Sequence, residues 1–333
     1  MKKLKLLIPL AFVCGSFTVS AQSYFTAEIP DIVRYKVTED VKYGEGAVLI
    51  DGKESMKDLV MDVYYPTSEA DGPRASVILT HGGSWHRGHP RVPYVGLGSQ
   101  STTMSQYAMR YAQEGYVAFT IRYRVATDNP ANAPYEGFTE DDLETDFFNT
   151  PQAIAQGNVI RAQMGLEMFT NDNVVDIMKS AVIASAEDLR TAIRHVKDAS
   201  DQYNIDPEKI ALAGFSAGAA TSINVAYGMQ EEVAAVVVNS GYPTVFNMEK
   251  LMTSAEGMPP ALIFLAQNDY PVVDMEIKPF LKHLDNLGAE YDFNWIPGLG
   301  HFYPSGSTSL GSDGSQMSIE QRSLQFLNDK LRN

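Results

Sequence analysis

The chain turns from a short apolar run into an alanine-rich one at Gly214-Phe215-Ser216-Ala217-Gly218. Residues 209–213, before the turn, are typical of a buried strand, and residues 219–229, after it, are typical of a helix. A serine on such a strand-to-helix turn is held in a strained backbone conformation that exposes its hydroxyl. Its small neighbours let the strand and the helix pack closely. This segment therefore predicts an α/β fold in which Ser216 is a candidate nucleophile.

Strands and helices alternate on both sides of this turn. We expect strands at residues 35–43, 59–65, 75–80, 116–121, 210–213, 233–239, 261–266 and 291–296. We expect helices at residues 101–113, 181–203, 219–229, 275–287 and 318–331. The central strands are uniformly apolar, which indicates a mainly parallel sheet of about eight strands with helices on both faces.

One region, residues 125–179, interrupts this alternation. It carries three prolines, an acidic run at residues 140–142 and scattered aromatic residues. Loops of this length are uncommon in compact domains unless they have a function. Two interpretations stay open: an inserted, cap-like segment that partly covers the site, or a surface decoration with a small core of its own.

The first 21 residues predict a secretory signal peptide. Three lysines precede an apolar run at residues 6–13, and Val19-Ser20-Ala21 is a typical cleavage site. The run is too short for a permanent bilayer anchor, so we expect no stable membrane insertion, one domain at residues 22–333, and a secreted or periplasmic protein. The alternative is a lipoprotein that carries its lipid on Cys14.

The composition is that of an ordinary globular protein, with 44% hydrophobic and 20% charged residues. The net charge of −15 becomes −18 without the signal segment, which holds three lysines and no carboxylate. This acidity argues against nucleic acid as a partner. Cys14 is the only cysteine, so the mature chain is expected to have no disulfide, no thiol nucleophile and no cysteine-ligated metal.

A serine nucleophile needs a general base, and the base needs an acid that orients it. The candidate base is His301, in a glycine-containing loop after the last predicted strand. The candidate acid is Asp269, just past the strand at residues 261–266, and its rival is Asp274. Both candidates follow the carboxyl ends of strands, where parallel sheets place their chemistry. The other histidines of the mature chain either lie on predicted helices or precede the serine: His81, His86, His89, His195 and His283.

A second glycine-containing loop, His81-Gly82-Gly83-Ser84-Trp85, follows the strand at residues 75–80. Acyl transfer builds negative charge on a carbonyl oxygen, and the loss of one aligned N–H donor costs about 3 kcal/mol. Glycines let the backbone approach that oxygen. We expect the donors to be the N–H groups of Gly83, with Ser84 or Gly82, and of Ala217 after the nucleophile.

These motifs together resemble the esterase and lipase branch of the α/β-hydrolases, over residues 35 to the C-terminus. The similarity is greatest to secreted carboxylesterase and feruloyl-esterase-like members with a His-Gly-Gly-x-Trp signature. The sequence departs from them in two places. Ser84 stands where many relatives have a third glycine, and residues 125–179 are longer than in the group.

The resemblance implies the α/β-hydrolase fold and a serine hydrolase of carboxylic esters that forms an acyl-enzyme without metal or organic cofactor. Its substrate would be a small-molecule or carbohydrate ester, and the aromatic residues Trp85 and Phe215 are candidate substrate contacts. Such residues also fill most protein cores. Three alternatives stay open: a peptidase like prolyl oligopeptidase, a lactonase or sugar deacylase, and a catalytically inactive hydrolase fold used for binding.

Overall fold

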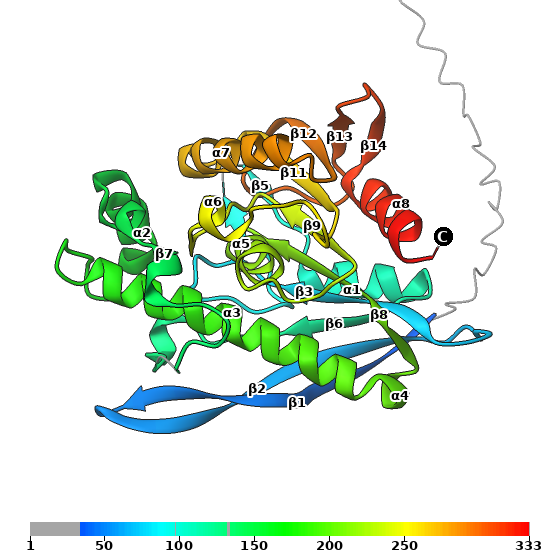
Figure 1. Ribbon diagram of the computed structural model, residues 1–333, viewed down its shortest axis with the longest axis horizontal. Coiled ribbons are helices and arrows are strands. Elements are labelled where there is room, and N and C mark those ends of the chain that lie inside the picture. The colour runs from blue at the N-terminus through cyan, green and yellow to red at the C-terminus, as the bar shows by residue number, and fades with distance from the viewer. Residues whose placement is uncertain (1–33, 97, 132–133, 333) are drawn as a thin grey trace, which may run out of the picture. The chain divides into compact units, whose positions relative to one another are not determined.

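A ten-stranded sheet forms the centre of the computed structural model, which describes residues 34–96, 98–131 and 134–332 (Figure 1). In spatial order its strands are β1 (Tyr35–Ile50), β2 (Lys53–Pro66), β6 (Val117–Ile121), β3 (Arg74–Thr80), β8 (Ile205–Phe215), β9 (Ala235–Asn239), β11 (Ala261–Asn268), β12 (Tyr291–Gly300), β13 (Thr308–Gly311) and β14 (Gln316–Ser318). The six strands from β6 to β12 run parallel, and the strands at the two edges pair antiparallel. The predicted α/β class and mainly parallel sheet are confirmed.

All eight predicted strands are present, and the sheet has two more than expected. The additional strands, β13 and β14, form a short antiparallel hairpin beyond β12. They are four and three residues long, and their Ser- and Gly-rich sequence lacks the apolar run that predicts a strand. The predicted signal peptide at residues 1–21 lies outside the described residues.

Helices cover both faces of the sheet. On one face lie α1 (Met104–Gln113) and α8 (Ile319–Leu331), and on the other lie α3 (Val174–Asp198), α5 (Ala217–Ile223) and α7 (Pro271–Leu287). Strand β8 shows why both faces need cover. Its residues Ile210 and Leu212 belong to the core under α3, whereas Ala211 and Ala213 belong to the core under α8. Successive side chains of a strand point to opposite faces, so a strand apolar at every position is buried on both.

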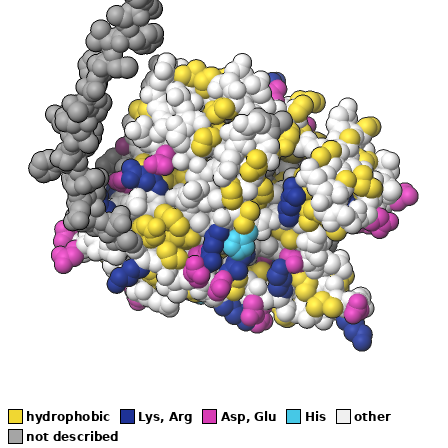
Figure 2. All heavy atoms as spheres, turned by 180° about the vertical axis from the view of Figure 1, so that it is seen from behind, with side chains coloured by type: hydrophobic (Ala, Val, Ile, Leu, Met, Phe, Trp, Pro, Cys, Tyr) yellow, Lys and Arg dark blue, Asp and Glu magenta, His cyan; other side chains and the backbone are white. Residues whose placement is uncertain are grey.

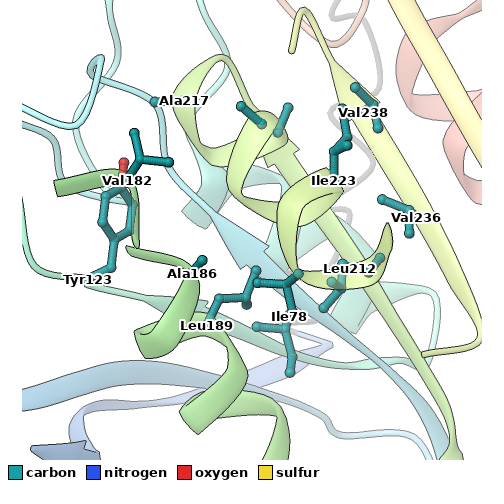
Figure 3. Packing of buried hydrophobic residues seen from close by; sticks show 14 of the residues in the cluster. Ile78, Tyr123, Val182, Ala186, Leu189, Leu212, Ala217, Ile223, Val236 and Val238 are labelled. Atoms are coloured by element: carbon teal, nitrogen blue, oxygen red, sulfur yellow. The ribbon is translucent and has the colours of Figure 1, made fainter. Parts of the chain in front are cut away.

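The core under α3 contains closely packed apolar side chains from the helix and from the strands beneath it. Figure 3 shows Ala186 and Leu189 of α3 facing Ile78 of β3 and Leu212 of β8. All four side chains are buried. This packing fixes β3 and β8 relative to each other, and both strands lead into loops of the candidate site.

Residues 125–179 contain several short elements rather than one loop. These are the 3-10 turns η1 (Ala126–Asp128), η2 (Glu140–Asp142) and η3 (Asp146–Asn149), the strand β7 (Leu143–Glu144) and the helix α2 (Pro151–Gln163). The last six residues of the expected insertion are the first turns of α3, which begins at Val174 and not at residue 181. The insertion therefore ends earlier than predicted, because α3 continues through it on a buried face.

Two attachments join this region to the rest of the fold. Strand β7 pairs with β10 (Val245–Phe246), which follows β9. At the other end, the buried Arg124 guanidinium donates to Asp188 and Glu187 of α3 and to the carbonyl of Ala47. Charged groups are rarely buried unless they are paired in this way.

Among the described residues, no helix has the length and apolar character needed to cross a bilayer. On the face shown in Figure 2, acidic and basic side chains are interspersed with hydrophobic ones.

The other elements are the hairpin of β4 (Val95–Gly96) and β5 (Ser99–Gln100), the helices α4 (Ser200–Tyr203) and α6 (Met248–Leu251), and the π-helical segment Asn224–Gly228.

Candidate active site

Ser216 lies on the sharp turn that the sequence predicts. Its backbone has φ 54° and ψ −120°, which places a non-glycine residue in a strained region directly before α5. The flanking glycines are sterically required. A Cβ on Gly214 would lie 2.3 Å from the Gly218 carbonyl oxygen, and a Cβ on Gly218 would lie 2.1 Å from the Thr80 carbonyl oxygen. The Ser216 N–H donates to the Asn239 carbonyl at 2.9 Å, which ties the turn to β9.

The structure brings the three predicted side chains into hydrogen-bonding contact. His301 Nε2 lies 2.8 Å from Ser216 Oγ, and His301 Nδ1 lies 2.5 Å from Asp269 Oδ1. The side chains of His301 and Asp269 are 3% and 0% exposed, so water does not compete for the contact between them. The rival Asp274 instead accepts from Lys278 on the exposed surface of α7.

Sheet order explains why residues so distant in sequence meet. Strands β8, β9, β11 and β12 are neighbours and parallel, so their carboxyl ends lie along one edge of the sheet. Ser216 follows β8, Asp269 follows β11 and His301 follows β12. The histidine loop lies beside the aspartate because Asn268 pairs with Gly300 across a register shift.

Two further groups hold the Asp269 carboxylate. The N–H of Tyr270 donates to Oδ1 at 2.8 Å, and the Ser240 hydroxyl donates to Oδ2 at 2.5 Å. Ser240 Oγ also lies 2.9 Å from the Tyr303 hydroxyl. Because a carboxylate only accepts and Ser240 has one proton, the Tyr303 hydroxyl must donate to Ser240. Both side chains are buried, and burial raises the pKa of Tyr303 well above its usual value, so the phenol keeps its proton.

The sequence did not identify Ser240, Tyr270 and Tyr303 as residues of the site. Each adjoins a recognised feature: Ser240 directly follows the predicted strand 233–239, and Tyr270 and Tyr303 follow Asp269 and His301 closely. The Tyr270 ring also lies 4.5 Å from the His301 ring. Position at a strand end was the available signal, but the residue types alone did not distinguish these groups from ordinary loop residues.

The predicted oxyanion loop lies against the serine. A Cβ on Gly82 would lie 3.1 Å from the Ser216 Cβ and 3.0 Å from the Phe215 carbonyl oxygen, so a larger residue here would push the two loops apart. Gly83 and Ser84 have φ values of 115° and 53°. In the described chain, the N–H groups of Gly83, Ser84 and Ala217 donate no hydrogen bond to another protein group. They are therefore free to donate to a substrate oxygen.

Two tyrosines, the half-buried Tyr94 and the buried Tyr123, hold this loop in place. The Tyr94 hydroxyl donates to the Gly82 carbonyl at 2.6 Å, and the Tyr123 hydroxyl donates to the His81 carbonyl at 2.9 Å. The His81 ring stacks on Tyr123 at 4.3 Å, and its Nδ1 lies 2.7 Å from the Gly82 carbonyl oxygen. Burial lowers the pKa of His81 to about 4, so this imidazole is neutral at pH 7 and donates through Nδ1–H. Its role here is to shape the loop.

The two predicted substrate contacts have different positions. Trp85 is buried, and its indole N–H donates to Thr221 of α5 at 3.1 Å, while another part of the residue lines a cavity described below. Phe215 is buried 5.1 Å from the His301 ring, with its ring also near Tyr303. Phe215 thus packs behind the imidazole as a core residue.

The site contains the groups that acyl transfer needs. No group of three or more His, Cys, Asp or Glu residues in the described chain has the arrangement of a metal site. A hydroxyl, an imidazole and a buried carboxylate in hydrogen-bonding sequence, beside free N–H groups, are the parts of a serine hydrolase.

Comparison with known proteins agrees with this geometry. The family model BD-FAE matches residues 176–250, which include Ser216 and Ser240. A carbohydrate esterase from gut microbiota, solved in truncated form, has a TM-score of 0.55 at 15% identity, over 91% of this chain and 99% of that chain. Esterase 2 from Thermogutta terrifontis with bound propionate has a TM-score of 0.53 at 16% identity, over 90% and 94% of the two chains. The same esterase phosphoramylated by tabun has a TM-score of 0.51.

The chain therefore has the α/β-hydrolase fold. The resemblance predicted from the motifs is confirmed, since an esterase-like family model matches the segment around the serine and the similar solved structures are esterases of this fold. At identities of 15–16%, the similar structures show the fold but not the activity of this chain, which depends on the chemistry of its own residues.

Proposed function

We propose that this protein is a serine hydrolase of carboxylic esters that works through an acyl-enzyme. The observation that carries the proposal is the unbroken contact from Ser216 through His301 to Asp269, at 2.8 and 2.5 Å. The first distance is that of an ordinary hydrogen bond, and the second is shorter than is usual for an N–H donor and a carboxylate. The similar solved structures are esterases, one of them with bound propionate, which supports ester hydrolysis as the reaction.

The proposed mechanism has two halves. Ser216 Oγ attacks the ester carbonyl while His301 Nε2 takes the hydroxyl proton, and the resulting oxyanion accepts from the N–H groups of Gly83 or Ser84 and of Ala217. The tetrahedral intermediate collapses, and His301 gives its proton to the leaving alcohol. Water then attacks the acyl-enzyme with His301 as base, which releases the acid and restores Ser216.

Asp269 keeps the imidazole in the tautomer that this chemistry needs. Its Oδ1 accepts from His301 Nδ1–H, so the unprotonated Nε2 faces the serine. The carboxylate also stabilises the imidazolium that forms during attack. The structure supports Asp269 in this role over Asp274, because Asp274 lies on α7 in an ion pair with Lys278.

A pair of variants tests the proposal. Ser216→Ala should abolish hydrolysis of p-nitrophenyl acetate without a change in melting temperature, and Asp269→Asn should lower kcat by orders of magnitude. The matched control Asp274→Asn should keep wild-type activity. Turnover by Ser216→Ala at the wild-type rate would refute the mechanism. Failure of the wild-type protein to react with a fluorophosphonate probe at Ser216 would favour a binding role for the fold.

We also propose that the protein is secreted or periplasmic and that the mature chain begins at Gln22, on the evidence of the N-terminal sequence alone. The N-terminus of protein recovered from the periplasm or medium can be read by mass spectrometry. A first residue of Gln22 is expected, whereas a lipid-modified Cys14 would show anchoring instead.

A further inference from the structure

A small cavity separates the insertion from the oxyanion loop. Its volume is about 60 Å³. Its lining residues come from the loop after β3, with Ser84 and Trp85, from the loop after β9, with Tyr242, and for the larger part from residues 147–178. Most of these groups are apolar, and most belong to the insertion or the first turns of α3.

The cavity lies beside the nucleophile. In the sheet, β8 lies between β3 and β9. Ser84 and Trp85 are in the loop after β3, and Tyr242 is in the loop after β9. A cavity lined from both loops therefore lies next to the carboxyl end of β8, where Ser216 is. Ser84 also connects the cavity to the oxyanion site, because this residue both lines the cavity and carries a free N–H.

One face of helix α2 forms a wall of the cavity. Ala153, Gln156, Gly157 and Ile160 follow the i, i+3, i+4, i+7 spacing of a single helix face. Ala155, two residues from Ala153, points away and is exposed. The side chain at residue 153 therefore controls the space inside the cavity, while that at residue 155 does not.

The far wall is held in place by contacts around Phe169. A Cβ on Gly157 would lie 2.7 Å from the Phe169 ring, so this ring packs directly on the α2 backbone. The Phe169 N–H donates to Asn158 at 2.6 Å, and the Arg161 guanidinium covers the ring at 4.3 Å. These contacts oppose enlargement of the cavity by movement of Phe169.

The size of the cavity selects among ester acyl groups. A cavity that holds benzene in another protein measures about 150 Å³, more than twice the volume here, so this pocket, which is not closed off from solvent, encloses too little space to bury an aromatic acyl group. That space suits a saturated acyl group of about two to four carbons, which gains from apolar walls.

We propose that this cavity binds the acyl group of the substrate and that helix α2 limits that group to short aliphatic chains. The inference rests on the proposed ester hydrolysis and adds the class of acyl group to it. The insertion acts as a specificity element in this proposal, with Ala153 and Ile160 as the residues that set acyl length.

The test compares two leucine substitutions on the same helix. Ala153→Leu places three extra carbons in the cavity, and Ala155→Leu places them in solvent. Activity is measured on p-nitrophenyl acetate, butyrate, hexanoate and octanoate and on methyl ferulate. Wild type should prefer acetate or butyrate. Ala153→Leu should lower kcat/KM for butyrate relative to acetate by about tenfold or more, and Ala155→Leu should leave the profile unchanged.

A third variant guards against a trivial loss of folding. Ile160→Ala enlarges the cavity and should raise the hexanoate-to-acetate ratio, a gain that an unfolded protein cannot show. Equal profiles for wild type, Ala153→Leu and Ile160→Ala would overturn the assignment of the cavity while leaving ester hydrolysis intact. A wild-type preference for octanoate or ferulate would also overturn it. No turnover of any ester by wild type would refute the proposed function itself.

Discussion

Removing the Ser240 hydroxyl is expected to slow the chemical step with little effect on substrate binding. Ser240 does not line the acyl cavity. It donates to the Asp269 oxygen that His301 does not use, at 2.5 Å. In Ser240→Ala, the Oδ2 oxygen of a fully buried carboxylate loses the Ser240 donor, and the carboxylate gains freedom to rotate. His301 is then oriented less firmly when its positive charge forms.

The size of the effect follows from the nature of the bond. A hydrogen bond to a charged group contributes about 1.5–3 kcal/mol, and each 1.36 kcal/mol of activation free energy is a factor of ten in rate. If the bond supports mainly the transition state, kcat should fall by about tenfold to a hundredfold while KM changes little. Tyr303 donates to Ser240 and not to the carboxylate, so Tyr303→Phe should cost less.

Steady-state kinetics on p-nitrophenyl acetate, together with melting temperatures, measure these quantities. Ser240 has φ 51°, a conformation that glycine adopts without strain, so Ser240→Gly removes the hydroxyl but not the backbone geometry. Both variants should lose the same factor in kcat. Full activity in Ser240→Gly with low activity in Ser240→Ala would refute the reasoning, because the backbone and not the hydroxyl would then matter. Ser309 is a buried serine whose hydroxyl donates to the Met317 carbonyl, so Ser309→Ala controls for the loss of a buried hydroxyl elsewhere.

Two further predictions concern stability. Gly218→Ala should lower the free energy of unfolding by at least about 2 kcal/mol, because its Cβ would lie 2.1 Å from a backbone oxygen. The control is Gly72→Ala, whose Cβ would have nothing within 4 Å and which should change the free energy of unfolding little. Equal losses in denaturant titrations of the two variants would contradict the steric argument. Burial lowers the pKa of His81 to about 4 from an unfolded value near 6.5, so its neutral form stabilises the fold fully above pH 6.5 and that contribution is lost as the pH falls toward 4. Between pH 7.5 and pH 5 the loss should be about 2 kcal/mol. Urea titrations at both pH values should show a smaller decrease for His81→Asn than for wild type, and an equal decrease would show that another group is responsible.

Much of the fold could be predicted because its signals are local. A strand buried on both faces is apolar along its buried length, as in residues 210–213 of β8 and 235–238 of β9, and such runs predicted the central strands of the sheet. The elements that escaped prediction lack this signal. The hairpin of β13 and β14 is short and polar, and α2 has an apolar face toward only a small cavity, although its Thr150-Pro151 start is a recognisable helix beginning.

The turn around Ser216 and the position of each triad residue at a strand end followed from the amino-acid sequence alone. Glycine sterics and apolar runs act within a few residues, so they can be read along the chain. The tertiary fold sets which strand ends are neighbours. It placed Ser240 and Tyr303 behind Asp269, moved Phe215 into the core behind His301, and set α2 against the oxyanion loop. Those contacts join segments tens of residues apart, and they depend on sheet order and packing, which no local pattern of residues encodes.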